Sequence, residues 1–380
     1  MFASAPSPES RWPWIDTLRG LAILSVVLLH IDIRIPMAQS ALGEWVPREV
    51  SRVLFRSGYY GVRVFFVISG FLITSTLLRR MRDASSLNVR DFYARRFARI
   101  APCLLVLLGV LSVLHLAPVE GFVVTRTTLG QALFSALTFH VNELEIAVGY
   151  LPAPWDVLWS LSIEEIFYIV YPLVLFFVRW TPARFAIAAA LITIGPLART
   201  SWATNDLDSD YAFLAGFDGI AIGCLAAFAL RRFAPSPRVL RVARLIGLGL
   251  MLLIVVFRGT SGRLGLGRLG LDVTVLAIGA GLFLWSTATL PQQTPSRVLA
   301  PLRWLGRHSY EVYLTHSFLT IGGLQLFRAI GSPRVAIPFF HLGIVTASAA
   351  LGALVVRYLS EPANRALRDR FSRIEPARRR

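Results

Sequence analysis

The residues of this chain best suited to chemistry are an acid, a base and an imidazole along one apolar segment near the N-terminus. Asp16, Arg19 and His30 interrupt the apolar run over 15–33. In a helix that turns about 100° and rises ~1.5 Å per residue, Arg19 and His30 share one face, roughly 16 Å apart along the axis. Ionisable groups at membrane depth are costly and are seldom kept without a partner or a function. This face therefore predicts chemistry at a membrane. The alternative for His30 is an interfacial histidine bonded to a backbone carbonyl.

A pair of glutamates marks a second segment, expected to be a helix over 157–178. Glu164 and Glu165 lie one to two turns inside its outer end, at the depth expected for His30. Ser160, Glu164 and Tyr168 share one face by i, i+4 spacing. A carboxylate at this level could orient a histidine and raise its basicity, so we expect Glu164 to orient His30. The alternative is that the glutamates only cap the helix or form structural ion pairs.

Arginines mark two more segments. Arg63 lies near the outer end of the segment over 59–78, where it is available to Glu164, Glu165 or a substrate. Arg96 and Arg99 lie one turn apart before the segment over 100–116, and such a pair can hold a phosphate by forked hydrogen bonds. The alternative for this pair is a topology signal alone. His316 is expected near the inner half of the segment over 309–328, where a structural hydrogen-bonding role is favoured.

The composition indicates a polytopic membrane protein. The 380 residues are 55% hydrophobic and only 16% charged, whereas soluble domains carry about a quarter charged residues. We predict an all-α fold with about ten membrane-spanning helices in one bundle, because apolar runs long enough to cross the bilayer recur throughout. These runs cover 15–33, 59–78, 100–116, 157–178, 183–200, 212–230, 240–257, 270–290, 309–328 and 336–358. Residues 1–360 are expected to form one membrane domain, followed by a short Arg-rich tail over 361–380.

The distribution of charge sets the expected orientation. The net charge of +17 comes from arginine alone, since the chain has no lysine, and arginines crowd the connections at 79–99 and 231–244. Acids gather in the alternate connections, at 120–156 and 206–210. Basic loops stay in the cytoplasm, so both termini are predicted to be cytoplasmic. The arginines at 258–268 argue against this orientation. The same pattern explains the charge without nucleic acid as a partner.

Cys103 and Cys224 lie in apolar runs and suggest neither a disulfide nor a metal site.

Taken together, these segments resemble the membrane acyltransferase 3 family, in five blocks that follow one another along nearly the whole chain. The blocks are Asp16-x-Leu18-Arg19-Gly20 with His30, Gly61-Val62 with Phe65-Phe66-Val67-Ile68-Ser69-Gly70-Phe71, Arg96-x-x-Arg99 with Pro102, Trp159-Ser160-Leu161-Ser162-Ile163-Glu164 with Phe167-Tyr168, and Ser309-Tyr310 with Tyr313-Leu314 and His316. Each block is weakly diagnostic, but the ordered set on such a chain is specific.

The resemblance implies an activity. Members of the family move acyl groups, commonly acetyl, from cytoplasmic acyl-coenzyme A to hydroxyls of carbohydrate-type acceptors such as surface polysaccharide, lipopolysaccharide or other exported glycans. It implies no tightly bound cofactor, a bacterial cytoplasmic (inner) membrane location and possible glycan-assembly partners. Many members carry an additional esterase-like domain, which is not expected here. A macrolide-type acceptor is an alternative, and a multi-span secondary transporter is the alternative from another class.

The resemblance and the residues together suggest a division of roles. Arg96 and Arg99 would hold the phosphates of coenzyme A, and Arg19 would lie near the thioester or the pantetheine arm. His30 would act as general base or transient acyl carrier, oriented by Glu164, with Arg63 stabilising oxyanion charge. Asp16, Ser69, Glu165, Tyr168 and His316 are further candidates.

Overall fold

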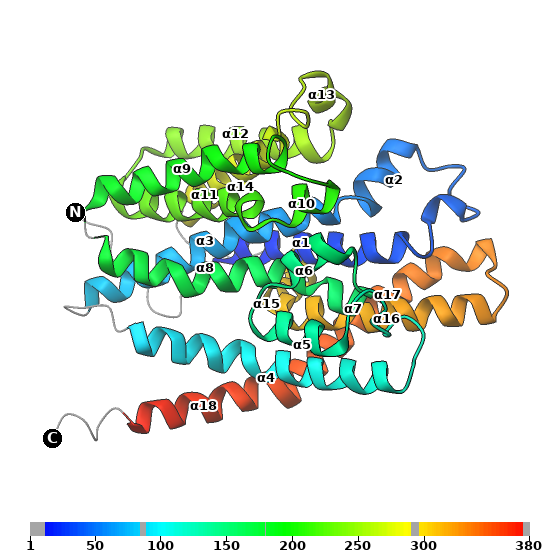
Figure 1. Cartoon of the computed structure of the whole chain (residues 1–380). Coiled ribbons are helices and arrows are strands. Elements are labelled where there is room, and N and C mark those ends of the chain that lie inside the picture. The colour runs from blue at the N-terminus through cyan, green and yellow to red at the C-terminus, as the bar shows by residue number, and fades with distance from the viewer. Residues whose placement is uncertain (1–11, 84–88, 179, 290–295, 375–380) are drawn as a thin grey trace.

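The structure is a computed structural model that describes residues 12–83, 89–178, 180–289 and 296–374. Within these ranges the regular secondary structure is entirely helical, and the long helices lie roughly parallel in one bundle (Figure 1). Each of the ten predicted apolar runs forms a helix. These are α1 (Pro13–Asp32), α3 (Gly58–Asp83), α4 (Val89–Leu116), α8 (Leu158–Phe177), α9 (Thr181–Arg199), α11 (Phe213–Arg232), α12 (Pro237–Val255), α14 (Leu271–Ala288), α16 (Ser309–Ala329) and α17 (Ile337–Val355).

Eight stretches of helix in the described part of the chain are long and apolar enough to cross a membrane. The all-α polytopic prediction is therefore confirmed, but two of the ten predicted spans, α12 and α16, are not among the eight. α12 begins with a basic stretch that contains Arg238, Arg241 and Arg244. α16 carries buried polar side chains, including His316 and Thr320, which are costly in contact with lipid but not inside a bundle.

Short helices occupy the connections. One half of the bundle, on the right in Figure 1, carries α2 (Arg48–Phe55), α5 (Leu129–Leu137), α6 (Val141–Val148), α7 (Ala153–Asp156), α10 (Asp206–Tyr211) and α13 (Arg258–Arg263). α5 begins at a capping box of Thr128 and Gln131. α13 is joined to the residues after α2 by Arg258, whose Nη2 donates to the Arg56 carbonyl at 3.1 Å and to Ser57 Oγ at 2.5 Å.

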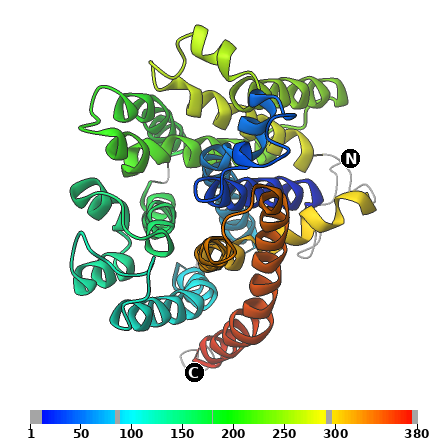
Figure 2. The same cartoon turned by 90° about the vertical axis from the view of Figure 1, so that its right-hand side faces the viewer.

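The described part of the predicted tail is helical. A π-helical turn, Val356–Ser360, joins α17 to α18 (Glu361–Ile374), and α18 packs against α4. Viewed from the end that carries α2, α17 and α18 form one edge of the bundle, and α12 and α13 lie at another (Figure 2). α1 begins and α18 ends toward the same end of the bundle (Figure 1). Residues 375–380 of the predicted tail lie outside the described residues.

Two helix crossings bring backbones into direct contact through glycine. A Cβ added to Gly70 of α3 would collide with the Ile220 carbonyl of α11, and one added to Gly223 would collide with the Val67 carbonyl. α1 meets α15 (Ala300–Arg307) in the same way, because a Cβ on Gly20 would strike Leu302 and one on Gly306 would strike the Asp16 carbonyl. Small residues allow such close approach where van der Waals packing holds membrane helices together. These crossings fix α1 and α3, which carry several of the candidate residues.

Candidate active site

A cavity of about 280 Å³ opens among α1, α3, α4, α8 and α16. Its lining includes Arg19, Ser69, Arg99, Glu164 and Tyr313, so the structure brings together residues from all five sequence blocks. Apolar side chains such as Phe65 and Leu161 cover most of the remaining wall. Few polar groups converging in a mostly apolar cavity are typical of a small-molecule site.

Arg19 lies where α1 meets α16. Its Nη2 donates a hydrogen bond of 2.8 Å to Ser309 Oγ, at the start of α16. It also lies close enough to Asp16 and Glu164 to interact with both carboxylates. Asp16 and Arg19 line a second, adjoining cavity as well. The predicted side-by-side placement of these two residues therefore agrees with the structure, and Arg19 lies between the two cavities.

The two arginines of the Arg-x-x-Arg block have different surroundings. Arg96 Nη2 lies 2.5 Å from Glu165 Oε1, and its guanidinium stacks 3.6 Å from the centre of the Tyr168 ring. Arg99 is exposed, lines both cavities and has no ion pair within the described part of the chain. The guanidinium of Arg96 is thus already paired with Glu165, and its predicted role as a phosphate ligand stays a prediction.

Glu164 faces the first cavity and does not contact His30. It interacts with Ser69 of α3 and lies near Arg96 and Arg19. Successive helical residues point about 100° apart, so Glu164 and Glu165 separate: one faces the cavity and the other pairs with Arg96. The prediction that Glu164 orients His30 is therefore wrong.

The hydrogen-bonding partner of His30 is a second histidine. His30 Nδ1 lies 2.9 Å from His316 Nε2, and the ring centroids are 4.9 Å apart. His316 is fully buried, one turn beyond the cavity-lining Tyr313, whose hydroxyl lies 2.7 Å from Ser160 Oγ. His316 lies in the first half of α16, which is the inner half in the predicted orientation, and its structural role stays a prediction. It reaches the level of His30 because the start of α16 lies beside Arg19, well along α1.

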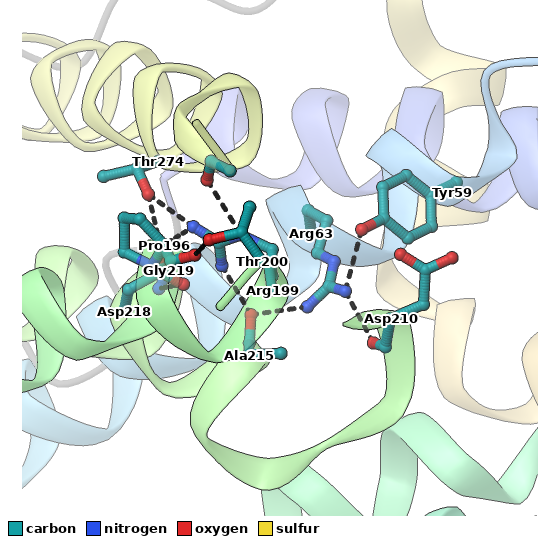
Figure 3. A network of polar contacts seen from close by, with 11 residues as sticks. Tyr59, Arg63, Pro196, Arg199, Thr200, Asp210, Ala215, Asp218, Gly219 and Thr274 are labelled. Carbon is teal, nitrogen blue, oxygen red and sulfur yellow. Dashed lines mark hydrogen bonds and ion pairs between the residues drawn. The ribbon is translucent and has the colours of Figure 1, made fainter. Parts of the chain in front are cut away.

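Arg63 does not face the cavity. Its side chain is 1% exposed, and it donates to the carbonyls of Ala215 at 3.0 Å and Asp210 at 2.6 Å and to the Tyr59 hydroxyl at 2.9 Å (Figure 3). The carbonyl of Ala215 also accepts from Arg199, which pairs with Asp218 at 2.7 Å. Arg63 is therefore not placed at this cavity, and its predicted role at the oxyanion is unsupported by the arrangement. It ties α3 to the start of α11, and the sequence did not reveal that role because its partners are backbone carbonyls.

The adjoining cavity, of about 930 Å³, was not predicted. It is lined by Arg19, Arg79, Arg99 and Arg307 together with acidic residues, including Glu311 and Glu361. Arg79 belongs to the basic connection recognised in the sequence, but Arg307 carried no signal beyond its charge. α18 closes one side of this cavity through Glu361 and Asn364. The wall is strongly polar and suits a charged ligand.

No arrangement of three or more His, Cys, Asp or Glu side chains able to hold a metal ion occurs in the described ranges. Cys103 and Cys224 are free and buried. The polar side chains at the site carry imidazole, carboxylate, hydroxyl and guanidinium groups.

Comparison with known proteins gives a consistent result. The family model of the acyltransferase domain matches residues 12–358. The chain is similar to the peptidoglycan O-acetyltransferase OatA of Listeria monocytogenes, with 29% identity over 329 residues, 80% of this chain and 48% of that protein. It is also similar to the putative peptidoglycan O-acetyltransferase YrhL of Bacillus subtilis, with 26% identity over 382 residues, 92% of this chain and 54% of that protein. The O-acetyltransferase OatA of Staphylococcus aureus is 25% identical over 328 residues, 80% of this chain and 50% of that protein.

The chain thus spans about half the length of the curated relatives it matches. No solved structure matches it significantly. The family model covers nearly the whole chain, including His30, His316 and most of the residues that line both cavities. The chain therefore belongs to the acyltransferase 3 family.

Proposed function

We propose that this protein is an integral membrane O-acyltransferase that moves an acetyl group from acyl-coenzyme A to a hydroxyl of an exported glycan. The observation that carries the proposal is the cavity in which Arg19, Arg99 and Glu164 face one space, next to Tyr313 and one turn from the His30–His316 pair. The family and the names of the similar proteins support acetyl transfer to a glycan rather than to a macrolide.

The donor would enter at the arginine-rich end. A coenzyme A donor carries phosphates at one end and a thioester at the other, joined by a flexible arm. The adjoining cavity offers Arg79, Arg99 and Arg307 for the phosphates, and guanidinium forks suit phosphate oxygens. The arm would pass Arg19 into the first cavity, toward Tyr313. This direction requires the start of α1 to face the cytoplasm, where acyl-coenzyme A is made.

The transfer itself would occur at His30. The imidazole takes the proton of the acceptor hydroxyl while the hydroxyl oxygen attacks the thioester carbonyl carbon. The new C–O bond forms, the C–S bond breaks, and the thiolate of coenzyme A receives the proton from His30. About 16 Å separates Arg19 from His30 along α1, so the extended donor arm would cover this distance.

The test is acetyl transfer by the purified protein in lipid nanodiscs, with radiolabelled acetyl-coenzyme A and glycan strands of peptidoglycan as acceptor. His30→Ala should lower kcat by about 10²-fold or more, the usual contribution of a general base. Arg263→Ala is a matched control, because Arg263 lies on α13, away from both cavities. Labelled acetyl found on His30 before acceptor is added would show an acyl carrier instead of a base. Absence of acetyl-coenzyme A binding by calorimetry, with longer acyl donors also failing, would contradict the proposal.

A further inference from the structure

The pairing of His30 with His316 determines which nitrogen of His30 is free. The bond joins His30 Nδ1 to His316 Nε2 at 2.9 Å. A neutral imidazole has one N–H donor and one lone-pair acceptor, so the direction of a bond between two histidines depends on what the remaining nitrogens contact. The remaining contacts of His316 are therefore informative.

Backbone carbonyls fix the tautomer of His316. Its Nδ1 lies 2.7 Å from the Tyr313 carbonyl and 3.2 Å from the Val312 carbonyl. A carbonyl oxygen only accepts, so Nδ1 must carry the proton. In the neutral ring Nε2 then holds the lone pair, and it can only accept a hydrogen from His30. The side chain of His316 is fully buried, which excludes water as a competing partner.

We propose that His316 is a positioning residue that holds His30 in the tautomer with a proton on Nδ1, leaving Nε2 as the atom that takes the acceptor's proton. This inference rests on the proposed function in one respect, that His30 Nε2 takes the proton of the acceptor hydroxyl. The position of the proton is a separate property of the pair. A histidine base oriented by a hydrogen bond at its other nitrogen follows the general logic of catalytic histidines, with a neutral ring as the orienting group here.

A second contact holds the backbone that carries the His30 ring. Arg34 Nη1 donates a hydrogen bond of 2.7 Å to the carbonyl of His30, in the last turn of α1. The backbone that carries the ring is thus fixed by Arg34, while His316 fixes the ring itself. His30 as a residue is half-buried, whereas His316 is fully buried.

The tautomer can be measured without turnover. The chain has six histidines, so ¹⁵N NMR of histidine-labelled protein in lipid gives a spectrum in which the His30 signals are those lost in His30→Ala. The expected result is a protonated Nδ1 and an unprotonated Nε2 on His30. The opposite tautomer in the wild-type protein would overturn the inference, even if acetyl transfer were confirmed.

Kinetics of two variants test the positioning role. His316→Gln keeps a side-chain carbonyl that can accept from His30 Nδ1, whereas His316→Leu cannot accept. In His316→Leu, kcat should fall by about 10²-fold with the KM for acetyl-coenzyme A within about twofold, and His30 should show mixed tautomers. His316→Gln should recover most of kcat and the wild-type tautomer.

His341→Leu is the matched control, because His341 is 3% exposed and bonds the Ile35 carbonyl at 2.8 Å without touching His30. Its kcat should stay within about threefold of wild type. An unchanged kcat in folded His316→Leu would contradict the positioning role. If His316→Leu does not fold, the kcat of His316→Gln and the tautomer seen in the wild-type spectrum decide whether His316 positions His30. A wild-type protein with the expected tautomer but no acetyl transfer would contradict only the proposed function.

Discussion

At the scale of single residues, the two arginines of one helical turn have different surroundings. Arg96 is bonded to Glu165 and covered by the Tyr168 ring, whereas Arg99 faces both cavities without an ion pair in the described part of the chain. A charge already neutralised by a carboxylate attracts a phosphate much less than an unpaired one. The two positions should therefore respond differently to substitution.

Arg99→Ala should raise the KM for acetyl-coenzyme A by about tenfold to 10²-fold, because a charge-assisted hydrogen bond to phosphate contributes about 1.5–3 kcal/mol. Its kcat at saturating donor should change little. Steady-state kinetics with varied donor concentration measures both constants. An equal effect on donor and acceptor KM would contradict a donor-binding role.

Arg96→Met should lower the free energy of unfolding. It leaves Glu165 buried without its partner, which typically costs about 3–5 kcal/mol for a fully buried pair. We expect about 2 kcal/mol, because the Arg96 side chain is 24% exposed. The double variant Arg96→Met/Glu165→Met removes both charges and should recover most of the loss. Thermal unfolding in detergent checks this, and a double variant no more stable than the single one would contradict it.

Glu145 gives the stability a pH dependence. Its side chain is fully buried and accepts from the Leu151 amide at 2.9 Å. Burial, and then the nearby charge of Asp156, raise the pKa of Glu145 well above its usual value. Between about pH 4.3 and the raised pKa, the folded protein keeps a proton that the unfolded chain releases. The free energy of unfolding should therefore fall as pH rises through this window, by at most about 1.4 kcal/mol per pH unit.

Glu145→Gln should reduce that slope, since glutamine cannot titrate, and the part that remains belongs to the neighbouring Asp156 carboxyl. Unfolding temperatures between pH 4 and 8 provide the measurement. Glu120→Gln is a suitable control, because Glu120 is an exposed side chain that pairs with Arg328 at the surface. An unchanged slope in Glu145→Gln would show that another group is responsible.

Residue identities were predicted better than residue partners. Arg19, Ser69, Arg99 and Glu164 were named as candidates from the sequence, and all four line the first cavity. The sequence placed Glu164 at the depth of His30, whereas Glu164 lies near Arg19. It could not show that Arg63 bonds carbonyls of Asp210 and Ala215, nor that His316 meets His30, 286 positions earlier. Such partners depend on how far one helix is displaced along another, and helical periodicity carries no information about that displacement.

At the scale of helices, the crossing of α3 and α11 determines where the cavity wall lies. α3 presents Ser69 to the cavity and, one residue later, packs Gly70 against the Ile220 carbonyl. Any side chain at Gly70 would push α11 away and shift Ser69. The glycine in this sequence block is therefore explained by packing.

Gly70→Ala should destabilise the protein by about 1–3 kcal/mol, the usual cost of overpacking. Gly109→Ala is the matched control, because Gly109 is also inside a long helix but has open space where the methyl would lie. The control should be neutral or slightly stabilised, since alanine favours helix over glycine by up to about 1 kcal/mol. Equal unfolding temperatures for the two variants would contradict the packing argument.

At the scale of the whole molecule, the apolar runs were sufficient to predict every long helix, because a segment in lipid must satisfy its backbone internally. The charged connections predicted the orientation, and the group at 258–268 was its main exception. Arg258 of that group is bound to residues 56–57 beside α2. Arg258 therefore has structural partners in this connection, which account for an arginine there.

Cysteine labelling tests the orientation directly, because the native Cys103 and Cys224 are buried. Trp45, before α2, is 84% exposed, and Phe233, after α11, is 61% exposed. With the start of α1 in the cytoplasm, Trp45→Cys should react with an impermeant maleimide in intact cells. Phe233→Cys should react only after permeabilisation, and the reverse pattern would overturn the orientation.

The seating of α1 on α15 has a consequence for how the protein would work. Gly20 and Gly306 allow the two backbones to lie in direct contact, and Arg19 and His30 belong to the same uninterrupted helix. The distance between Arg19 and His30 is then set by the helix, and a movement of one half of the bundle against the other would not change it. A transporter moves its substrate by changing the arrangement of its own helices. In the proposed reaction the helices would keep their arrangement, and the extended arm of the donor would cover the distance from Arg19 to His30. The donor would then be selected by the length of its arm as much as by its charge.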